Sequence, residues 1–274
     1  MKAEELFSVE GLSAVVTGGA NGLGFAMARA LADNGARVTV LDIDGKAADA
    51  AVAELRQRGG TARAAVADLT DAKALRRVFA EIVEAQGGLD AVFANAGITA
   101  GPGFLTPEWT RDPAGAFENI SEELWNRVLD VNLNGVLFTI QAAVPHMKKQ
   151  GHGRIVVTTS IAGSKTSPAV GTPYLATKAA AAHLVRQVAV ELARYNILVN
   201  SIAPGPFLTK ITTPELEEVF KAASPLSRAA RTEELEGLVL FFASKASSFV
   251  TGAQYVIDGG TLLTVGLGSK KIPA

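Results

Sequence analysis

Tyr174 and Lys178 stand four residues apart in a stretch that reads as a helix, and together they could transfer a proton. Residues i and i+4 share one helix face, so the phenol and the ammonium can approach each other. A neighbouring cation stabilises tyrosinate and lowers the pKa of the phenol, as acid/base work near neutral pH requires. The same spacing also arises by chance in surface pairs, so this motif alone does not define an active site.

Ser160 ends the run Thr158-Thr159-Ser160, which closes a predicted strand at the edge of the sheet where ligands bind. Its hydroxyl can hydrogen bond to a substrate oxygen. The alternative is a cap for a helix or turn, which is the usual task of such a serine.

A glycine-rich turn joins the first predicted strand to the first helix, with the sequence Thr17-Gly18-Gly19-Ala20-Asn21-Gly22-Leu23-Gly24. Glycines let the backbone turn sharply and approach a pyrophosphate, and the helix N-terminus offers free N–H donors. The spacing is G-x-x-x-G-x-G rather than G-x-G-x-x-G, and no Gly-Lys-Ser/Thr follows as in nucleoside triphosphatases. The turn therefore predicts a dinucleotide site.

Asp42 ends the second predicted strand and favours NAD over NADP. A carboxylate at this place accepts hydrogen bonds from the adenosine ribose hydroxyls and repels a 2′-phosphate. No arginine or lysine stands at Asn21 or Ile43 to receive that phosphate. The alternative for Asp42 is a turn residue before Asp44-Gly45.

These motifs together resemble the short-chain dehydrogenase/reductase family. The resemblance runs in the family's order from about residue 10 to 260 and is carried by the following residues: Thr17–Gly24, Asn95-Ala96-Gly97, Asn132, Ser160, Tyr174, Lys178 and Pro204-Gly205. It implies hydride transfer between the nicotinamide and a substrate carbon that bears an oxygen, with no metal.

The resemblance also implies roles. Tyr174 would be the acid/base and Ser160 would position the reacting oxygen. Lys178 would lower the Tyr174 pKa and hold the nicotinamide ribose, and Asn132 would anchor a water in a proton relay to Lys178. Thr209 matches a threonine that bonds the carboxamide.

The predicted binding residues fall in two sets. The cofactor set is Gly18, Asn21, Gly22, Leu23, Gly24, Asp42, Ile43, Asp68, Leu69, Asn95, Ala96, Gly97, Tyr174, Lys178, Pro204, Gly205, Phe207 and Thr209. The substrate set is Ile98, Ile161, Ala162, Val170, Pro206, Phe207 and Leu208. The second set is mostly apolar, which suits a hydrophobic or aryl secondary alcohol or its ketone.

The chain departs from the family pattern at four places. Ala94 stands where the family often has a second asparagine, and the interval from Ser160 to Tyr174 is about one residue longer than usual. Segment 99–119 and the tail, 261–274, are longer than in common family members. Segments 99–119 and 206–231 leave the ligand edge and are candidate substrate loops. Aromatic residues in the first loop, Phe104, Trp109 and Phe117, either roof a pocket or anchor the loop.

Strands alternate with helices along the whole chain, which predicts a doubly wound parallel sheet with helices on both faces, in one domain covering 1–274. The predicted strands are 13–17, 37–42, 62–67, 91–94, 154–159, 198–202 and 254–257. The predicted helices are 23–34, 49–58, 72–86, 122–147, 174–195 and 233–243.

The composition excludes several classes of protein. The 274 residues carry a net charge of −1, which disfavours nucleic-acid binding. The absence of cysteine excludes disulfides and thiolate metal sites. The three histidines have no ligand spacing, so no metal is expected. No apolar run reaches the length of a membrane span and no secretory signal is evident, so we expect a cytoplasmic protein without membrane contact.

We therefore expect an NAD-dependent secondary-alcohol dehydrogenase with a small-molecule substrate. The family resemblance implies that the protein forms a homotetramer or dimer. Two alternatives remain: an NADPH-dependent 3-oxoacyl reductase, which Asp42 disfavours, and a catalytically idle nucleotide-sensing protein on the same fold, which the intact Asn132, Ser160, Tyr174 and Lys178 set disfavours.

Overall fold

The structure is a computed structural model that describes residues 2–106, 109–210 and 212–263. Seven parallel strands form one sheet in the order β3-β2-β1-β4-β5-β6-β7. Their bounds are β1 Ser13–Thr17, β2 Arg37–Asp42, β3 Thr61–Val66, β4 Ala91–Ala94, β5 Gly153–Thr158, β6 Ile197–Pro204 and β7 Gln254–Ile257. This confirms the predicted parallel sheet, and only strand ends differ.

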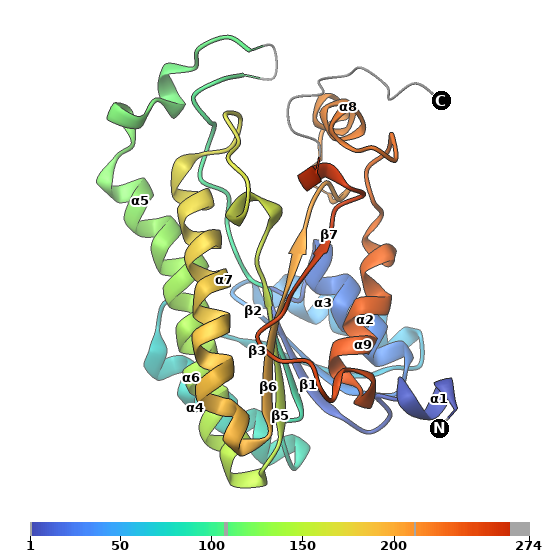
Figure 1. Cartoon of the computed structure of the whole chain (residues 1–274). Coiled ribbons are helices and arrows are strands. Elements are labelled where there is room, and N and C mark those ends of the chain that lie inside the picture. Colours follow the sequence, from blue (N-terminus) through green and yellow to red (C-terminus); the bar gives the residue numbers. More distant parts are fainter. Residues whose placement is uncertain (1, 107–108, 211, 264–274) are drawn as a thin grey trace.

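Helices cover both faces of the sheet (Figure 1). One face carries α2 Gly22–Asp33, α3 Gly45–Gln57 and α9 Glu236–Ala243, and the other carries α4 Ala72–Gln86, α5 Glu122–Leu129, α6 Gly135–Gln150 and α7 Thr172–Leu192. Two further helices, α1 Ala3–Leu6 and α8 Pro214–Ala223, lie outside these layers. This is the doubly wound arrangement expected of alternating strands and helices.

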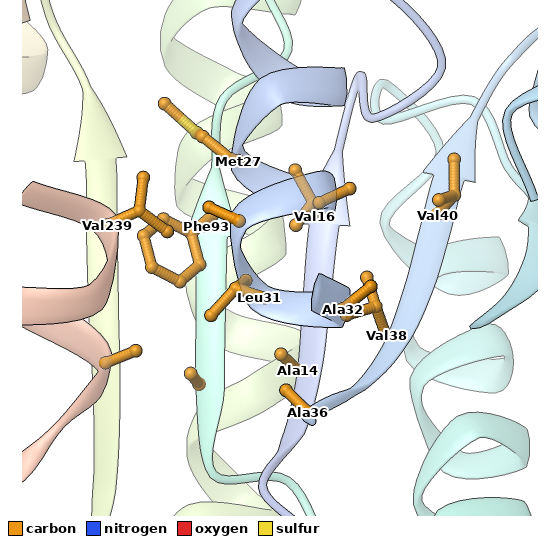
Figure 2. Packing of buried hydrophobic residues seen from close by; sticks show 14 of the residues in the cluster. Ala14, Val16, Met27, Leu31, Ala32, Ala36, Val38, Val40, Phe93 and Val239 are labelled. Atoms are coloured by element: carbon orange, nitrogen blue, oxygen red, sulfur yellow. The ribbon is translucent and has the colours of Figure 1, made fainter. Parts of the chain in front are cut away.

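Alternate residues of the central strands supply the two hydrophobic cores. Val16 and Phe93 pack with Met27 and Leu31 of α2 on one side, as Figure 2 shows. Val15 lies in the core on the opposite face. All five residues of β1 are fully buried, as expected for a strand covered on both faces.

Side-chain caps fix the starts of several helices. Asp44 accepts a hydrogen bond from the Ala47 amide at the start of α3. Asp71 accepts from the amides of Lys73 and Ala74 at the start of α4. Such caps satisfy N–H groups that lack a partner within the helix. Because Asp44 is a cap, α3 begins at Gly45 rather than at the predicted Asp49.

The long helix predicted over 122–147 runs from Glu122 to Gln150 and contains a π turn at Asp130–Asn134. By length and composition this is the one described helix that could cross a membrane. Core helices pass the same test, and this helix lies in the layer beside the sheet, where α6 contacts α4 and α5 contacts α7. Its apolar character is therefore explained by packing.

Segment 206–231 is not wholly a loop, as the sequence had suggested, because it contains α8. Thr213 caps this helix by accepting from the Leu216 amide, and Pro214 occupies its first turn. Segment 99–119 holds two 3₁₀ turns, Pro113–Gly115 and Phe117–Asn119. Of the tail, 261–263 forms a short 3₁₀ turn, and 264–274 lie outside the described residues.

Candidate active site

The first turns of α7 bring Tyr174 and Lys178 to the carboxyl end of β5. The Lys178 Nζ lies 5.6 Å from the centre of the Tyr174 ring. The same Nζ donates a 2.8 Å hydrogen bond to the backbone oxygen of Thr158, the last residue of β5. Lys178 is only 3% exposed. The i, i+4 spacing thus places both groups on the face of α7 that meets the sheet.

Ser160 takes the capping role considered for it, while its contact with a substrate oxygen stays a prediction. Its Oγ accepts a 3.1 Å hydrogen bond from the Ala162 amide and so caps the 3₁₀ turn Ile161–Gly163. Its side chain is also hydrogen bonded to Tyr174. A carbonyl oxygen that reaches both hydroxyls would therefore be held from two sides.

Asn132 lies in the π turn of the long helix and is fully buried. Its Oδ1 accepts from the Ile98 amide at 2.8 Å, and its Nδ2 donates to the Ile98 oxygen at 2.9 Å. The side chain therefore fastens the helix to the segment that follows β4. The proposed water relay to Lys178 remains a prediction.

Gly97 lies beside both Asn132 and Lys178, and a larger residue there would fit only if these side chains shifted slightly. A Cβ at this position would lie 3.1 Å from the Asn132 Oδ1 and 3.4 Å from the Lys178 Nζ. The glycine is therefore what allows the lysine, the asparagine and the backbone after β4 to meet at one point.

Thr158 is a site residue that the sequence did not reveal. Besides accepting from Lys178 through its backbone oxygen, it donates from Oγ1 to the Asn95 Oδ1 at 3.1 Å. Asn95 in turn donates from Nδ2 to the oxygens of Thr17 and Gly18. A chain of hydrogen bonds thus runs from the glycine-rich turn to the lysine. Every residue type has a backbone oxygen, so no sequence motif could have shown that the one of Thr158 accepts from Lys178.

Burial dominates the electrostatics of the pair. It raises the pKa of the Tyr174 phenol, an effect opposed by the hydrogen bond to Ser160. It lowers the pKa of the Lys178 ammonium to about 8. We expected Lys178 to lower the phenol pKa, but the shift in this structure is upward, because desolvation penalises the tyrosinate. The Tyr174 phenol is therefore neutral at pH 7 in this structure.

The glycine-rich turn has the backbone that a pyrophosphate needs. Gly18 and Gly22 adopt φ values of +60° and +54°, which favour glycine. A Cβ on Gly24 would collide with the backbone of Gly18 and lie 2.6 Å from the Asn95 Nδ2. Asn21 precedes α2 but makes no side-chain cap, so the first amides of the helix face outward for an anion. These residues fit the nicotinamide dinucleotide that the motif predicted.

Asp42 reaches the glycine-rich turn. Its Oδ2 accepts from the Ala20 amide and its Oδ1 from the Asp44 amide, each at 3.2 Å. The carboxylate therefore stands beside the turn at the end of β2, where an adenosine ribose would lie. Ile43 next to it is largely exposed.

The remaining cofactor residues fall along the same edge. Asp68 accepts from the amide and the hydroxyl of Thr70, both at 2.8 Å, whereas Leu69 is buried in the core. Thr209 lies across the turn, with its Cγ2 3.7 Å from where a Gly22 Cβ would be. Four further members of the predicted set lie at or beside the turn and at the ends of β4 and β6: Leu23, Ala96, Pro204 and Gly205.

The predicted substrate wall divides into open and buried members. Five residues are partly exposed, as a binding wall requires: Ile98, Ile161, Ala162, Val170 and Leu208. Pro206 is buried. Phe207 is 5% exposed and belongs to the hydrophobic core, so its side chain supports the wall from within rather than lining it.

The loop 99–119 is joined to the segment between Ser160 and Tyr174 by backbone contacts. The Gly103 amide donates to the Ala169 oxygen at 3.3 Å, and the Leu105 amide donates to the Pro168 oxygen at 3.0 Å. Pro102 and Val170 form an antiparallel bridge. We call this contact of 102–105 with 168–170 the loop seam.

The aromatic residues of this loop are all exposed. Phe104, Trp109 and Phe117 are 42%, 75% and 77% exposed, and the loop is held by the loop seam. The exposure of Trp109 and Phe117 disfavours anchoring for these two, and the role of the less exposed Phe104 stays open.

Comparisons with known proteins identify the family of this chain. A family model described as enoyl-(acyl carrier protein) reductase matches residues 18–261. The sorbose reductase of Schizosaccharomyces pombe is 37% identical and aligns over 93% of this chain and 97% of its own. The 5-keto-D-gluconate 5-reductase of Escherichia coli is 36% identical over 95% of this chain and 99% of its own.

Two solved structures are similar throughout. A gluconate 5-dehydrogenase from Burkholderia cenocepacia in complex with NADP and tartrate has a TM-score of 0.85 and 31% identity, covering 96% of this chain and 100% of its own. A 7α-hydroxysteroid dehydrogenase complexed with NADH and a 7-oxo bile acid has a TM-score of 0.84 and 32% identity, covering 95% and 98%. The chain belongs to the short-chain dehydrogenase/reductase family of oxidoreductases.

Proposed function

We propose that this protein interconverts a secondary alcohol and its ketone with NAD as the hydride carrier. The observation that supports this best is the buried meeting of Ser160, Tyr174 and Lys178 at the carboxyl end of β5. A catalytically idle protein has no need of a buried cation there, since burying it costs free energy.

In the proposed reaction, Tyr174 transfers the proton. In the reducing direction its neutral phenol donates a proton to the carbonyl oxygen, which Ser160 holds in place. In the oxidising direction the phenol first loses its proton to solvent, and the resulting tyrosinate accepts the alcohol proton. When bound, a nicotinamide supplies the hydride donor or acceptor. Lys178 would hold the nicotinamide ribose, and Asn132 would fix the backbone beside the lysine.

Asp42 supports NAD over NADP. Its carboxylate is fixed against the Ala20 amide, and an incoming 2′-phosphate would meet this negative charge. Neither Asn21 nor Ile43 supplies a compensating cation. The alternative, NADP, has support from the relative that was solved with NADP.

The substrate we propose is hydrophobic or aryl. Ile98, Ile161 and Val170 offer a partly exposed apolar wall near Ser160 and Tyr174. The exposed aromatic residues of loop 99–119 add to this character. Apolar walls of this kind suit apolar ligands with a single reacting oxygen.

A polyhydroxylated ketone or sugar acid is the second candidate. The relatives named sorbose reductase and 5-keto-D-gluconate 5-reductase favour it. Such a substrate would need several hydrogen-bonding groups from the two substrate loops.

Initial rates with NAD and NADP against matched panels of aryl alcohols and polyols test the proposal. We expect NADH formation with secondary aryl alcohols and a higher kcat/KM for NAD than for NADP. Turnover restricted to polyols would select the second candidate. Cofactor binding with no turnover on either panel, in both directions, would overturn the proposed activity.

A further inference from the structure

A cavity of about 210 Å³ lies at the opposite edge of the sheet from the nucleotide site. Its wall is built from the amino ends of β5 and β6, the residues just before β1 and β4, and the end of α9. The polar and charged side chains in the wall include Ser8, Asp90, His152, Arg154, Ser244 and Lys245. Arg154 stands four positions before Thr158 on β5, which is about 13 Å along the strand.

Arg154 is a half-buried cation without an acidic partner among the described residues. Its guanidinium makes one long hydrogen bond to a described residue, from Nη1 to the Ser247 Oγ at 3.4 Å. Burial lowers the pKa of its guanidinium, with no neighbouring carboxylate to oppose the effect. A guanidinium carries five N–H donors, so most of them remain available to a ligand in the cavity.

Lys245 adds a second positive charge to the wall. Its side chain is exposed and is in no salt bridge with any residue that the structure describes. It follows Ser244, whose hydroxyl accepts from the Ala246 amide. The ammonium is thus free to approach an anion in the cavity.

Asp90 is the one carboxylate in the cavity wall, and both of its oxygens are already engaged. Its Oδ1 lies 2.9 Å from the His152 Nε2, and its Oδ2 accepts from the Ser13 amide at 2.7 Å. Asp90 keeps its negative charge but forms no ion pair with Arg154 among the described residues. With one acidic and two basic side chains, the wall carries a positive surplus.

We propose that this cavity binds a small oxyanion, either a phosphate or a carboxylate group, between the guanidinium of Arg154 and the ammonium of Lys245. Planar guanidinium donors match the paired oxygens of either group. The apolar parts of the wall, at Leu12, Leu198 and Ala243, exclude water from one side and strengthen the charged contact. This site is distinct from the glycine-rich turn and is independent of the proposed activity.

Calorimetric titration of the NADH-saturated protein tests this site, because the bound cofactor keeps anions from the glycine-rich turn. One arm uses sodium phosphate and the other sodium succinate, each up to about 20 mM at constant ionic strength, a range that covers millimolar dissociation constants. We expect saturable binding at one site per chain in at least one arm. The arm that saturates identifies the kind of oxyanion. Absence of saturation in both arms overturns the proposal.

Arg154→Gln and Lys245→Gln should each weaken this binding about tenfold, because each removes a charged donor. Arg76→Gln removes the same charge from the exposed face of α4 and should leave it unchanged. Lys245 is exposed, so its variant keeps the test valid even where Arg154→Gln fails to fold. Binding that survives Lys245→Gln, or that falls equally in Arg76→Gln, would show non-specific attraction and refute the site.

Discussion

Lys178 combines two properties that oppose each other, full burial and a positive charge. Its hydrogen-bond partner is the backbone oxygen of Thr158, a dipole rather than a carboxylate. That partner recovers only part of the solvation lost, which is why the pKa of the ammonium falls to about 8. A buried cation beside a buried phenol is an arrangement that favours proton transfer over stability.

Tyr174→Phe should remove turnover while cofactor binding persists. Loss of a general acid typically costs 10² to 10⁴-fold in rate, so we expect kcat to fall by about 10³-fold. Steady-state rates and NADH fluorescence measure the two effects. Tyr195→Phe, outside the site beside Lys148, is the matched control and should retain full activity. Substantial turnover by Tyr174→Phe would assign the proton to another group.

The lowered pKa of Lys178 predicts that stability increases with pH. The folded-state pKa of about 8 lies below the ordinary value of 10.5, so the unfolded chain binds more protons between these two values. The burial penalty is fully present below pH 8 and fades as pH rises towards 10.5. Relative to Lys178→Met, the free energy of unfolding should rise by about 2 kcal/mol from about pH 7 to about pH 9.5.

Urea denaturation of both proteins across this pH range measures that difference. Any packing change caused by methionine is independent of pH and cancels in the slope. A difference between the two proteins that stays flat with pH would mean that Lys178 titrates normally in the folded state.

At the scale of secondary-structure elements, the residues at the ends of β2 and β5 determine which cofactor and substrate the site can bind. Two acids, one at the end of β2 and one two residues later, have separate tasks. Asp42 faces the glycine-rich turn, whereas Asp44 caps α3 through the Ala47 amide. Sequence position alone does not separate these tasks, because both acids border the same turn.

Asp42→Ala should therefore reduce the preference for NAD over NADP by about tenfold, the value of one charged contact. Asp44→Ala should leave that preference unchanged but lower the free energy of unfolding by about 1 kcal/mol, as the loss of a cap does. Ratios of kcat/KM for the two cofactors and thermal denaturation separate the outcomes. An unchanged ratio for Asp42→Ala would remove the basis for proposing NAD.

Gly115→Ala should loosen the loop seam. A Cβ at Gly115 would collide with the backbone of Gly103 and lie 2.8 Å from the Pro102 oxygen. We expect a several-fold higher KM for the ketone with an unchanged KM for NADH. Gly237→Ala in α9 meets no atom within 4 Å and is the matched control. An unaltered ketone KM would mean that the seam does not shape the substrate pocket.

For the whole molecule, the sequence predicted the sheet well because its strands are apolar runs between clear turn signals. The π turn at 130–134 could not be predicted, since its residues continue the helical apolar pattern. The helix α8 was missed although Thr213-Pro214 is a helix-start signal, because the Pro-Gly turn upstream suggested a loop. The burial of Phe207 was missed because residue type does not show which way a side chain points.

Association of copies is our prediction at this scale. Val190 on α7 is 79% exposed, and Trp125 on α5 is 37% exposed. The prediction rests on the family resemblance, because single exposed apolar side chains of this kind are common on any protein surface. Light scattering should give two or four times the 28.4 kDa chain mass. Val190→Glu should reduce it, whereas Val66→Glu at the β3 edge should not. A wild-type mass of one chain would contradict the prediction.

The loop seam bears on how this protein could acquire new substrates. Its hydrogen bonds join backbone atoms, so they do not depend on which side chains stand at 104 or 169. Gly103 and Gly115 are the fixed points, because their close backbone approach tolerates no larger residue. Mutation can therefore vary the exposed face of this loop without dismantling its support. Because the loop seam holds segment 99–119 through backbone atoms, the side chains of this segment are a natural starting point for a focused mutant library.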